Sequence, residues 1–177
     1  MASDTRAGAL QWGTPALQSE RDSVITIVAY DPASLEFASE GLRNDPATVY
    51  AAAKKHAWTL KFASLRLQHD TSFLRRLLKK NGRALKYVPE ELASDRDTVL
   101  DAVKNYGFAL EWASAELRGD YDVVLAAVTH SGMALQFASQ ALRGDRKIVM
   151  EALLQSPTAF RFASVEVQND PEAMAMT

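Results

Sequence analysis

The sequence contains no cysteine. Disulfides, thiolate metal sites, cysteine nucleophiles and iron–sulfur ligation are therefore excluded. No apolar run approaches the roughly 20 residues that a bilayer-spanning helix requires, and the first ten residues lack the apolar stretch of a secretory signal. We expect a soluble protein without a transmembrane segment, in the cytoplasm or, if a transit peptide has been removed, in an organelle. The sequence itself leaves the compartment unknown.

The motifs of several enzyme classes are also missing. The chain has no P-loop, no dinucleotide-binding glycine pattern, no G-x-S-x-G and no H-E-x-x-H. Its three histidines, His56, His69 and His130, do not have the spacing of metal ligands. We therefore expect no enzyme and assign no catalytic, cofactor-binding or metal-binding residues. An enzyme would need a site that sequence motifs do not mark.

What the sequence does have is a repeat of 25 residues. Leucine occurs at positions 10, 35, 60, 85, 110 and 135, and Phe160 takes the next position. Two positions later every repeat has an aromatic residue: Trp12, Phe37, Phe62, Tyr87, Trp112, Phe137 and Phe162. Each of these phrases ends at an acid: Glu20, Asp45, Asp70, Asp95, Asp120, Asp145 and Asp170. No insertion or deletion interrupts the spacing, so the pattern is a tandem repeat.

The segment after each acid has the spacing of an α-helix. Apolar residues follow the acid at +4, +7 and +8, as in Val124, Ala127 and Val128 after Asp120. We predict that the acids are helix N-caps, namely Asp45, Asp70, Asp95, Asp120, Asp145 and Asp170. The β-branched run VITIV at 24–28 fills the same positions, which favours helix over strand there. Glycines at 82, 107 and 132 are predicted to end these helices as C′ residues.

The apolar phrase, such as ALEWAS at 109–114, predicts a second, shorter helix. Pro89 replaces the serine of this phrase in one repeat, so we expect the helix to break there. The S-x-x-L that follows then forms a separate helical or 3₁₀ turn, with serine as its cap.

Helical units of 25 residues cannot bury their apolar faces alone and must stack on their neighbours. The predicted fold is all-α, an α-solenoid of about six two-helix repeats plus a partial seventh, forming an elongated right-handed superhelix. After a flank of residues 1–9, we expect one repeat domain at 10–177, with repeats at 10–34, 35–59, 60–84, 85–109, 110–134 and 135–159 and a partial repeat at 160–177.

The pattern A-L-x-aromatic-A-S-x-x-L-R-x-D-x-x-x-V-x-x-A-V, as it stands at 109–128, resembles the tandem-repeat family called domain of unknown function 4116. The resemblance covers about residues 10–177 and is clearest at 85–159. Repeat 10–34 departs from it with Trp12-Gly13-Thr14-Pro15, and repeat 60–84 with three leucines in its long helix. The resemblance implies a helical array, and it brings no catalytic motif and no known role.

Three recurring features could be read as functional. The repeated acids could suggest a metal site. Neighbouring helices lie about 8–10 Å apart, however, so equivalent acids of successive repeats are too far apart to bind the same ion. Arg-Gly-Asp at 118–120 and 143–145 resembles an adhesion motif, yet its aspartate is a predicted cap. The aromatic register could stack nucleic-acid bases, although we expect it to pack within the protein.

Charge is the feature that differs most between repeats. Residues 54–86 contain ten of the twenty basic residues and a single acid, Asp70, for a net charge of +9. Within this segment we assign candidate partner-binding residues at Arg75, Arg76, Lys79, Lys80, Lys54 and Lys55. A solvated face, a docking surface for an acidic protein, and a surface for RNA or anionic lipid are the three interpretations.

We expect the chain to be a non-catalytic protein–protein interaction scaffold, an adaptor or accessory subunit of a larger assembly. A nucleic-acid- or anionic-surface-binding solenoid is the alternative. Residues 170–177 begin a long helix whose +7 and +8 positions are not reached. This unfinished end favours a subunit that covers it, unless the chain was once longer.

Overall fold

The computed structural model describes residues 10–176, so the expected flank at 1–9 lies outside the described residues. Residues 10–176 form α-helices and 3₁₀-helices with no strand, and the helices pack in tandem as a helical repeat solenoid, as the sequence predicted. The described residues divide into two compact units, with the boundary between Val88 and Pro89.

The first unit contains nine described helices, of which α2, α4 and α6 are the long helices of successive repeats. They are α1 (Pro15–Ser19), α2 (Arg21–Tyr30), η1 (Pro32–Phe37), α3 (Glu40–Arg43), α4 (Pro46–Ala53), η2 (Ala57–Phe62), α5 (Leu65–Gln68), α6 (Thr71–Leu78) and η3 (Gly82–Tyr87). The β-branched run VITIV lies inside α2, which confirms that its repeat position predicts helix better than its strand propensity.

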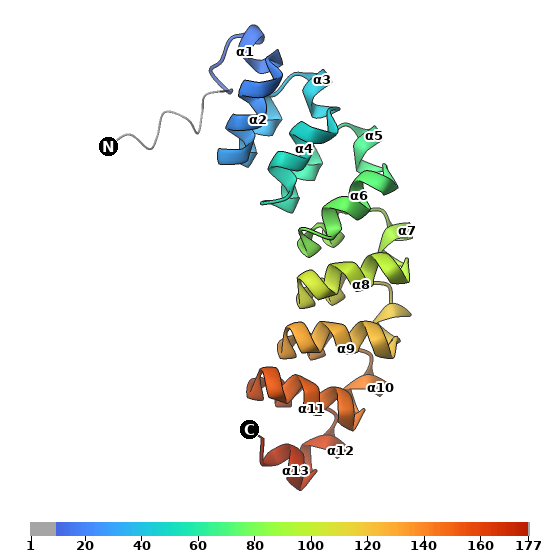
Figure 1. The fold of residues 1–177 in the computed structure, drawn as a ribbon. Helices are drawn as coiled ribbons and strands as arrows, with labels where there is room; N and C mark the ends of the chain where they lie inside the picture. The colour runs from blue at the N-terminus through green and yellow to red at the C-terminus, as the bar shows by residue number, and fades with distance from the viewer. Residues whose placement is uncertain (1–9, 177) are drawn as a thin grey trace, which may run out of the picture. The chain divides into compact units, whose positions relative to one another are not determined.

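The second unit repeats the same order, and its long helices α8, α9 and α11 lie side by side (Figure 1). Its helices are α7 (Glu90–Ala93), α8 (Arg96–Asn105), η4 (Gly107–Trp112), η5 (Leu117–Gly119), α9 (Tyr121–His130), η6 (Gly132–Phe137), α10 (Gln140–Arg143), α11 (Arg146–Gln155), η7 (Pro157–Phe162), α12 (Val165–Gln168) and α13 (Pro171–Met174).

Each repeat therefore consists of a long α-helix, a six-residue 3₁₀-helix and a short third helix. The apolar phrase is the 3₁₀-helix in η1, η2, η3, η4, η6 and η7, and it ends before the serine or, in η3, before Pro89. The S-x-x-L turn is separate, as predicted. It is an α-helix of four residues in most repeats and the 3₁₀-helix η5 in one. Because a 3₁₀-helix has three residues per turn, side chains adjacent in sequence point in different directions, so this helix has apolar side chains on more than one side.

Acidic side chains occupy the N-cap of every long helix. Each accepts a backbone N–H of the first turn; for example, Asp120 accepts from Val123 at 2.9 Å and Asp145 from Ile148 at 3.0 Å. The same arrangement is found at Glu20, Asp45, Asp70, Asp95 and Asp170. These bonds satisfy donors that the first turn of a helix leaves unpaired, so one residue type per repeat fixes where the long helix begins.

Two sets of equivalent repeat positions form the core of each unit. The leucines of the 3₁₀ phrase are at most 2% exposed at positions 10, 35, 60, 85, 110 and 135. In the long helices α4, α6, α8, α9 and α11 the residues at +3, +4, +7 and +8 after the cap are buried; in α9 these are Val123, Val124, Ala127 and Val128. In α2 the buried residues are those at +4 and +8, Val24 and Val28. Because α8, α9 and α11 each present this face to the neighbouring phrases, apolar surface is buried between repeats as well as within them.

A backbone hydrogen bond joins neighbouring repeats at the serine of the phrase. The serine N–H donates to the carbonyl oxygen 21 residues earlier, at 2.8 to 2.9 Å. The pairs are Ser39 to Gln18, Ser64 to Arg43, Ser114 to Ala93, Ser139 to Arg118 and Ser164 to Arg143. Pro89 has no N–H and cannot donate this bond. It is the first residue of the second unit.

The glycines do not end the long helices in the way that the sequence predicted. No described glycine has a positive φ, so none forms a left-handed C′ cap. Gly107 and Gly132 are instead the first residues of η4 and η6. A Cβ on Gly107 would lie 2.5 Å from the carbonyl oxygen of Ala127. Glycine is therefore required by close packing against the next long helix, not by an unusual backbone angle.

Candidate interaction site

The basic residues that the sequence singled out lie on α6 and directly after the ends of α4 and α6 in the first unit. In α6 the apolar side chains at 73, 74, 77 and 78 are buried and those of Arg75 and Arg76 are exposed. Lys79 and Lys80 follow directly and are exposed as well. All four basic side chains are therefore exposed, two of them within α6 and two directly after it.

The lysines of two neighbouring repeats occupy equivalent positions. Lys54 and Lys55 follow the end of α4, and Lys79 and Lys80 occupy the same positions one repeat later, at the end of α6. α4 and α6 are in contact, so the two lysine pairs follow the same ends of neighbouring helices in one unit. We call Lys54, Lys55, Arg76, Lys79 and Lys80 the basic edge.

Contacts within the protein orient part of the basic edge. The Arg76 guanidinium lies 5.1 Å from the centre of the Tyr50 ring on α4, a cation–π contact. The Lys55 ammonium donates to the carbonyl oxygen of Ala29 at 3.2 Å. Arg75 and Lys79 also make interactions with other residues. The basic edge is thus a partly organised cationic surface rather than a set of independent side chains.

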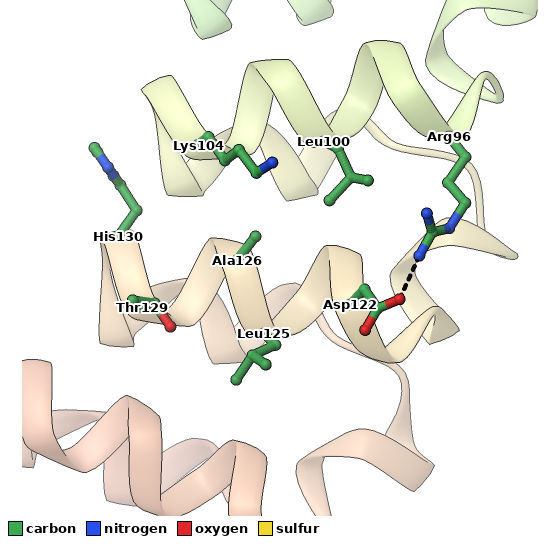
Figure 2. A pocket seen from close by; sticks show the side chains of 8 residues that line it. All are labelled: Arg96, Leu100, Lys104, Asp122, Leu125, Ala126, Thr129 and His130. Atoms are coloured by element: carbon green, nitrogen blue, oxygen red, sulfur yellow. Dashed lines mark hydrogen bonds and ion pairs between the residues drawn. The ribbon is translucent and has the colours of Figure 1, made fainter.

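A groove of about 650 Å³ lies between α8 and α9 in the second unit. In Figure 2, Leu100 of α8 and Ala126 of α9 point toward each other across it. Lys104 and His130 stand at one end, and Arg96 and Asp122 at the other. Leu100 and Ala126 are half-buried, whereas the charged side chains at both ends are exposed. The groove therefore has an apolar middle and polar ends.

An arginine links the N-terminal ends of α8 and α9. Arg96 Nε donates to Asp120 at 2.9 Å, and its Nη2 donates to Asp122 at 2.6 Å. The Arg96 hydrogen bond lowers the pKa of Asp120; partial burial opposes this, and the Val123 N–H adds to it. Arg146 makes the equivalent contacts with Asp170 and Glu172 one pair of repeats later. Two acids share one base, so this end of the groove carries a net negative charge.

Comparison with known proteins decides the family. The sequence profile described as domain of unknown function (DUF4116) matches four stretches, of which the first three overlap: residues 21–68, 48–92, 70–118 and 120–168. The chain belongs to the DUF4116 family. Each match is about as long as two of the 25-residue repeats, so the family's sequence unit is a pair of structural repeats. No curated protein and no solved structure matches the chain.

The Arg-Gly-Asp segments of this DUF4116 chain are parts of the repeat. Asp120 and Asp145 are N-caps, and Asp120 also binds Arg96. Arg118 is half-buried, and its carbonyl oxygen accepts the Ser139 N–H at 2.8 Å. The geometry therefore accounts for this motif by helix capping and repeat stacking.

The aromatic register lies at the border between core and solvent. Most of its members are half-buried, but Trp12 is 84% exposed and Tyr87 is 38% exposed. Trp112 stacks on Tyr106, with ring centres 6.2 Å apart, and Phe137 of η6 meets Phe108 of η4 edge-on at 6.1 Å. These rings pack beside the leucine register, which forms the actual core.

The histidines and acids do not gather into a metal site in the part of the chain that the structure describes. His69 Nδ1 lies 2.9 Å from the Leu65 carbonyl oxygen, and His130 stands at the end of the groove. Within residues 10–176, no helix is both long enough and apolar enough to cross a bilayer.

Sequence reasoning missed the groove. Its signal is present in the sequence as a small residue, Ala126, at a helix position where the neighbouring long helices carry Asp101 and Glu151. Comparing exposed positions from repeat to repeat, rather than only the shared ones, would have found it.

Proposed function

We propose that this DUF4116 chain is a non-catalytic interaction module, an adaptor or accessory subunit that binds an acidic protein through the basic edge. The observation that carries the proposal is the alignment of Lys54 and Lys55 with Lys79 and Lys80 at the ends of two packed helices. Equivalent residues on neighbouring helices stand about 8–10 Å apart, so the edge presents a row of cations to a complementary surface.

Two properties support a protein partner. Helical repeats offer extended surfaces that bind other chains along several repeats. Charge complementarity contributes to the encounter rate and to the choice of partner more than to affinity. A basic edge on one unit would accordingly orient an acidic partner, while other surfaces supply the apolar contacts.

The experiment compares two variants with the same change in net charge. The chain would be tagged and purified from its native source, and proteins recovered in stoichiometric amounts would be quantified at low and high salt. Lys54→Glu/Lys80→Glu reverses two charges of the basic edge. Lys147→Glu/Arg161→Glu reverses two exposed charges of the second unit.

We expect the basic-edge variant to lose a salt-sensitive partner that the control variant retains. Equal recovery by both variants would contradict the proposal. Nuclease treatment separates the alternative: if recovery depends on RNA, the basic edge is a nucleic-acid surface, because phosphate binding has the same salt dependence.

A further inference from the structure

The groove between α8 and α9 exists because two side chains differ from those one repeat later. Thr129 of α9 donates a hydrogen bond to the Glu151 carboxylate of α11 at 3.1 Å, so a side chain bridges these two helices. The residues 25 positions earlier are Lys104 and Ala126. Ala126 has no carboxylate to reach across to α8, and it lines the groove between α8 and α9.

Lys104 therefore faces a gap where its counterpart Thr129 faces an acid. Among the described residues, neither the Lys104 side chain nor the His130 side chain has a hydrogen-bond or ion-pair partner, and both are exposed at this end of the groove. The acid of the groove, Asp122, lies at the opposite end and is held by Arg96 (Figure 2). The charge pattern of the groove is thus incomplete at the Lys104 end.

We propose that this groove binds a peptide segment of a partner protein that supplies the missing carboxylate. An Asp or Glu of the segment pairs with Lys104, in the place that Glu151 occupies one repeat later. A neighbouring bulky apolar side chain of the segment packs on Leu100, Leu125 and Ala126. Peptide recognition in a groove between helices commonly combines apolar anchors with charged ends in this way.

The spacing of the two anchors follows from helix geometry. Leu100 and Lys104 are four residues apart on α8, a rise of about 6 Å. A helical segment would match this spacing with an acid four residues from its apolar anchor. An extended segment would match it with an acid two residues away, since strands rise about 3.3 Å per residue.

This inference rests on the proposal that the chain binds protein, but not on the basic edge. The groove lies in the second unit, whereas the basic edge lies in the first. The variant Lys54→Glu/Lys80→Glu should bind groove peptides as the wild type does. The two proposals can therefore fail separately.

The test selects a phage-displayed library of random twelve-residue peptides on the full chain and measures the synthesised peptides by fluorescence anisotropy. Ala126→Glu places a carboxylate where the neighbouring helix has Glu151, and Ala126→Met fills the groove without a change of charge. Ala115→Glu is the matched control, because Ala115 is an exposed alanine outside the groove. Thermal unfolding checks that each variant folds.

We expect Ala126→Glu and Ala126→Met to weaken binding at least tenfold, and Ala115→Glu to change it less than twofold. Lys104→Glu should weaken binding about three- to fivefold, as for a partly exposed ion pair. Replacing the peptide's acid by lysine should restore the affinity for Lys104→Glu. Recovery of peptides that bind Ala126→Glu as tightly as wild type, or of none that depend on the groove, would overturn the inference.

Discussion

Gly107 lies directly against the backbone of Ala127, one repeat later, so closely that a Cβ on Gly107 would be 2.5 Å from the Ala127 carbonyl oxygen. Gly132 stands in the same relation to Ala152. The obstructing atom in both cases is backbone and cannot rotate away. The distance between a 3₁₀-helix and the next long helix is therefore set by the absence of a side chain at this position.

Substitution of this glycine should destabilise the second unit. We predict that Gly107→Ala lowers the free energy of unfolding by about 1–3 kcal/mol, the usual cost of forcing extra volume into a packed interior. Gly41→Ala is the control, because a Cβ on Gly41 would have no atom within 4 Å. Gly41 lies in α3, where alanine should add about 0.5–1 kcal/mol. Urea unfolding of both variants measures the difference, and similar effects would refute the packing explanation.

The hydrogen bond between Ser139 N–H and the Arg118 carbonyl can be removed with little change of backbone conformation. Ser139 has φ −58° and ψ 156°, close to the −58° and 151° of Pro89. We predict that Ser139→Pro is about 1 kcal/mol less stable than Ser139→Ala, since an unpaired carbonyl costs more than the entropy that proline removes from the unfolded chain. Ser139→Ala controls for the hydroxyl, which accepts the Leu142 N–H at 3.4 Å. Equal stabilities in chemical denaturation would show that this bond contributes nothing.

The aspartate caps can be tested where no arginine is involved. The Asp145 side chain accepts the Ile148 N–H at 3.0 Å, and residue 121, one repeat before Arg146, is tyrosine rather than arginine. We predict that Asp145→Ala lowers the free energy of unfolding by about 1 kcal/mol, and that Asp145→Ser recovers most of it, because serine is also a good N-cap. A serine variant as unstable as the alanine variant would argue against capping.

The stabilisation that the Asp120 N-cap contributes to the folded chain should depend on pH. Its folded pKa lies below its ordinary value, chiefly because of the hydrogen bond from Arg96. As the pH falls through about 4, the unfolded chain takes up the proton first, so the stabilisation is present above this range and is lost below it. We predict that wild type is more stable than Asp120→Asn at pH 7 and that the difference shrinks as the pH falls below the ordinary aspartate pKa of about 4. A difference that is constant with pH would contradict the assignment.

Residues that act within a repeat were predictable from the sequence. The aspartate N-caps, the helix at VITIV and the buried +4, +7 and +8 positions follow from local capping and periodicity. The structure has all of them except that Ile27 in α2 is half-buried and Met174 in α13 is exposed. The separate S-x-x-L turn was predicted for the same reason, since Pro89 replaces the serine that precedes it.

Residues that act between repeats were not predictable in the same way. Glycine at 107 and 132 resembles a helix C-cap in sequence, but its cause is the position of a carbonyl one repeat later. The serine–carbonyl bond involves backbone atoms, which leave no mark on residue type except where proline prevents the bond. The groove depends on what Ala126 lacks relative to Glu151, and shared motifs do not report such differences.

The central claim is that successive repeats stand side by side, each long helix one step further along its unit. The absence of native cysteine makes a direct measurement simple. Lys104, Thr129 and Leu154 occupy one exposed register of α8, α9 and α11, and cysteine pairs at these positions can carry spin labels. Electron paramagnetic resonance should give a backbone separation of about 8–10 Å for 104 with 129 and roughly twice that for 104 with 154. A 104-to-154 separation no longer than the 104-to-129 separation would contradict the stacked repeat.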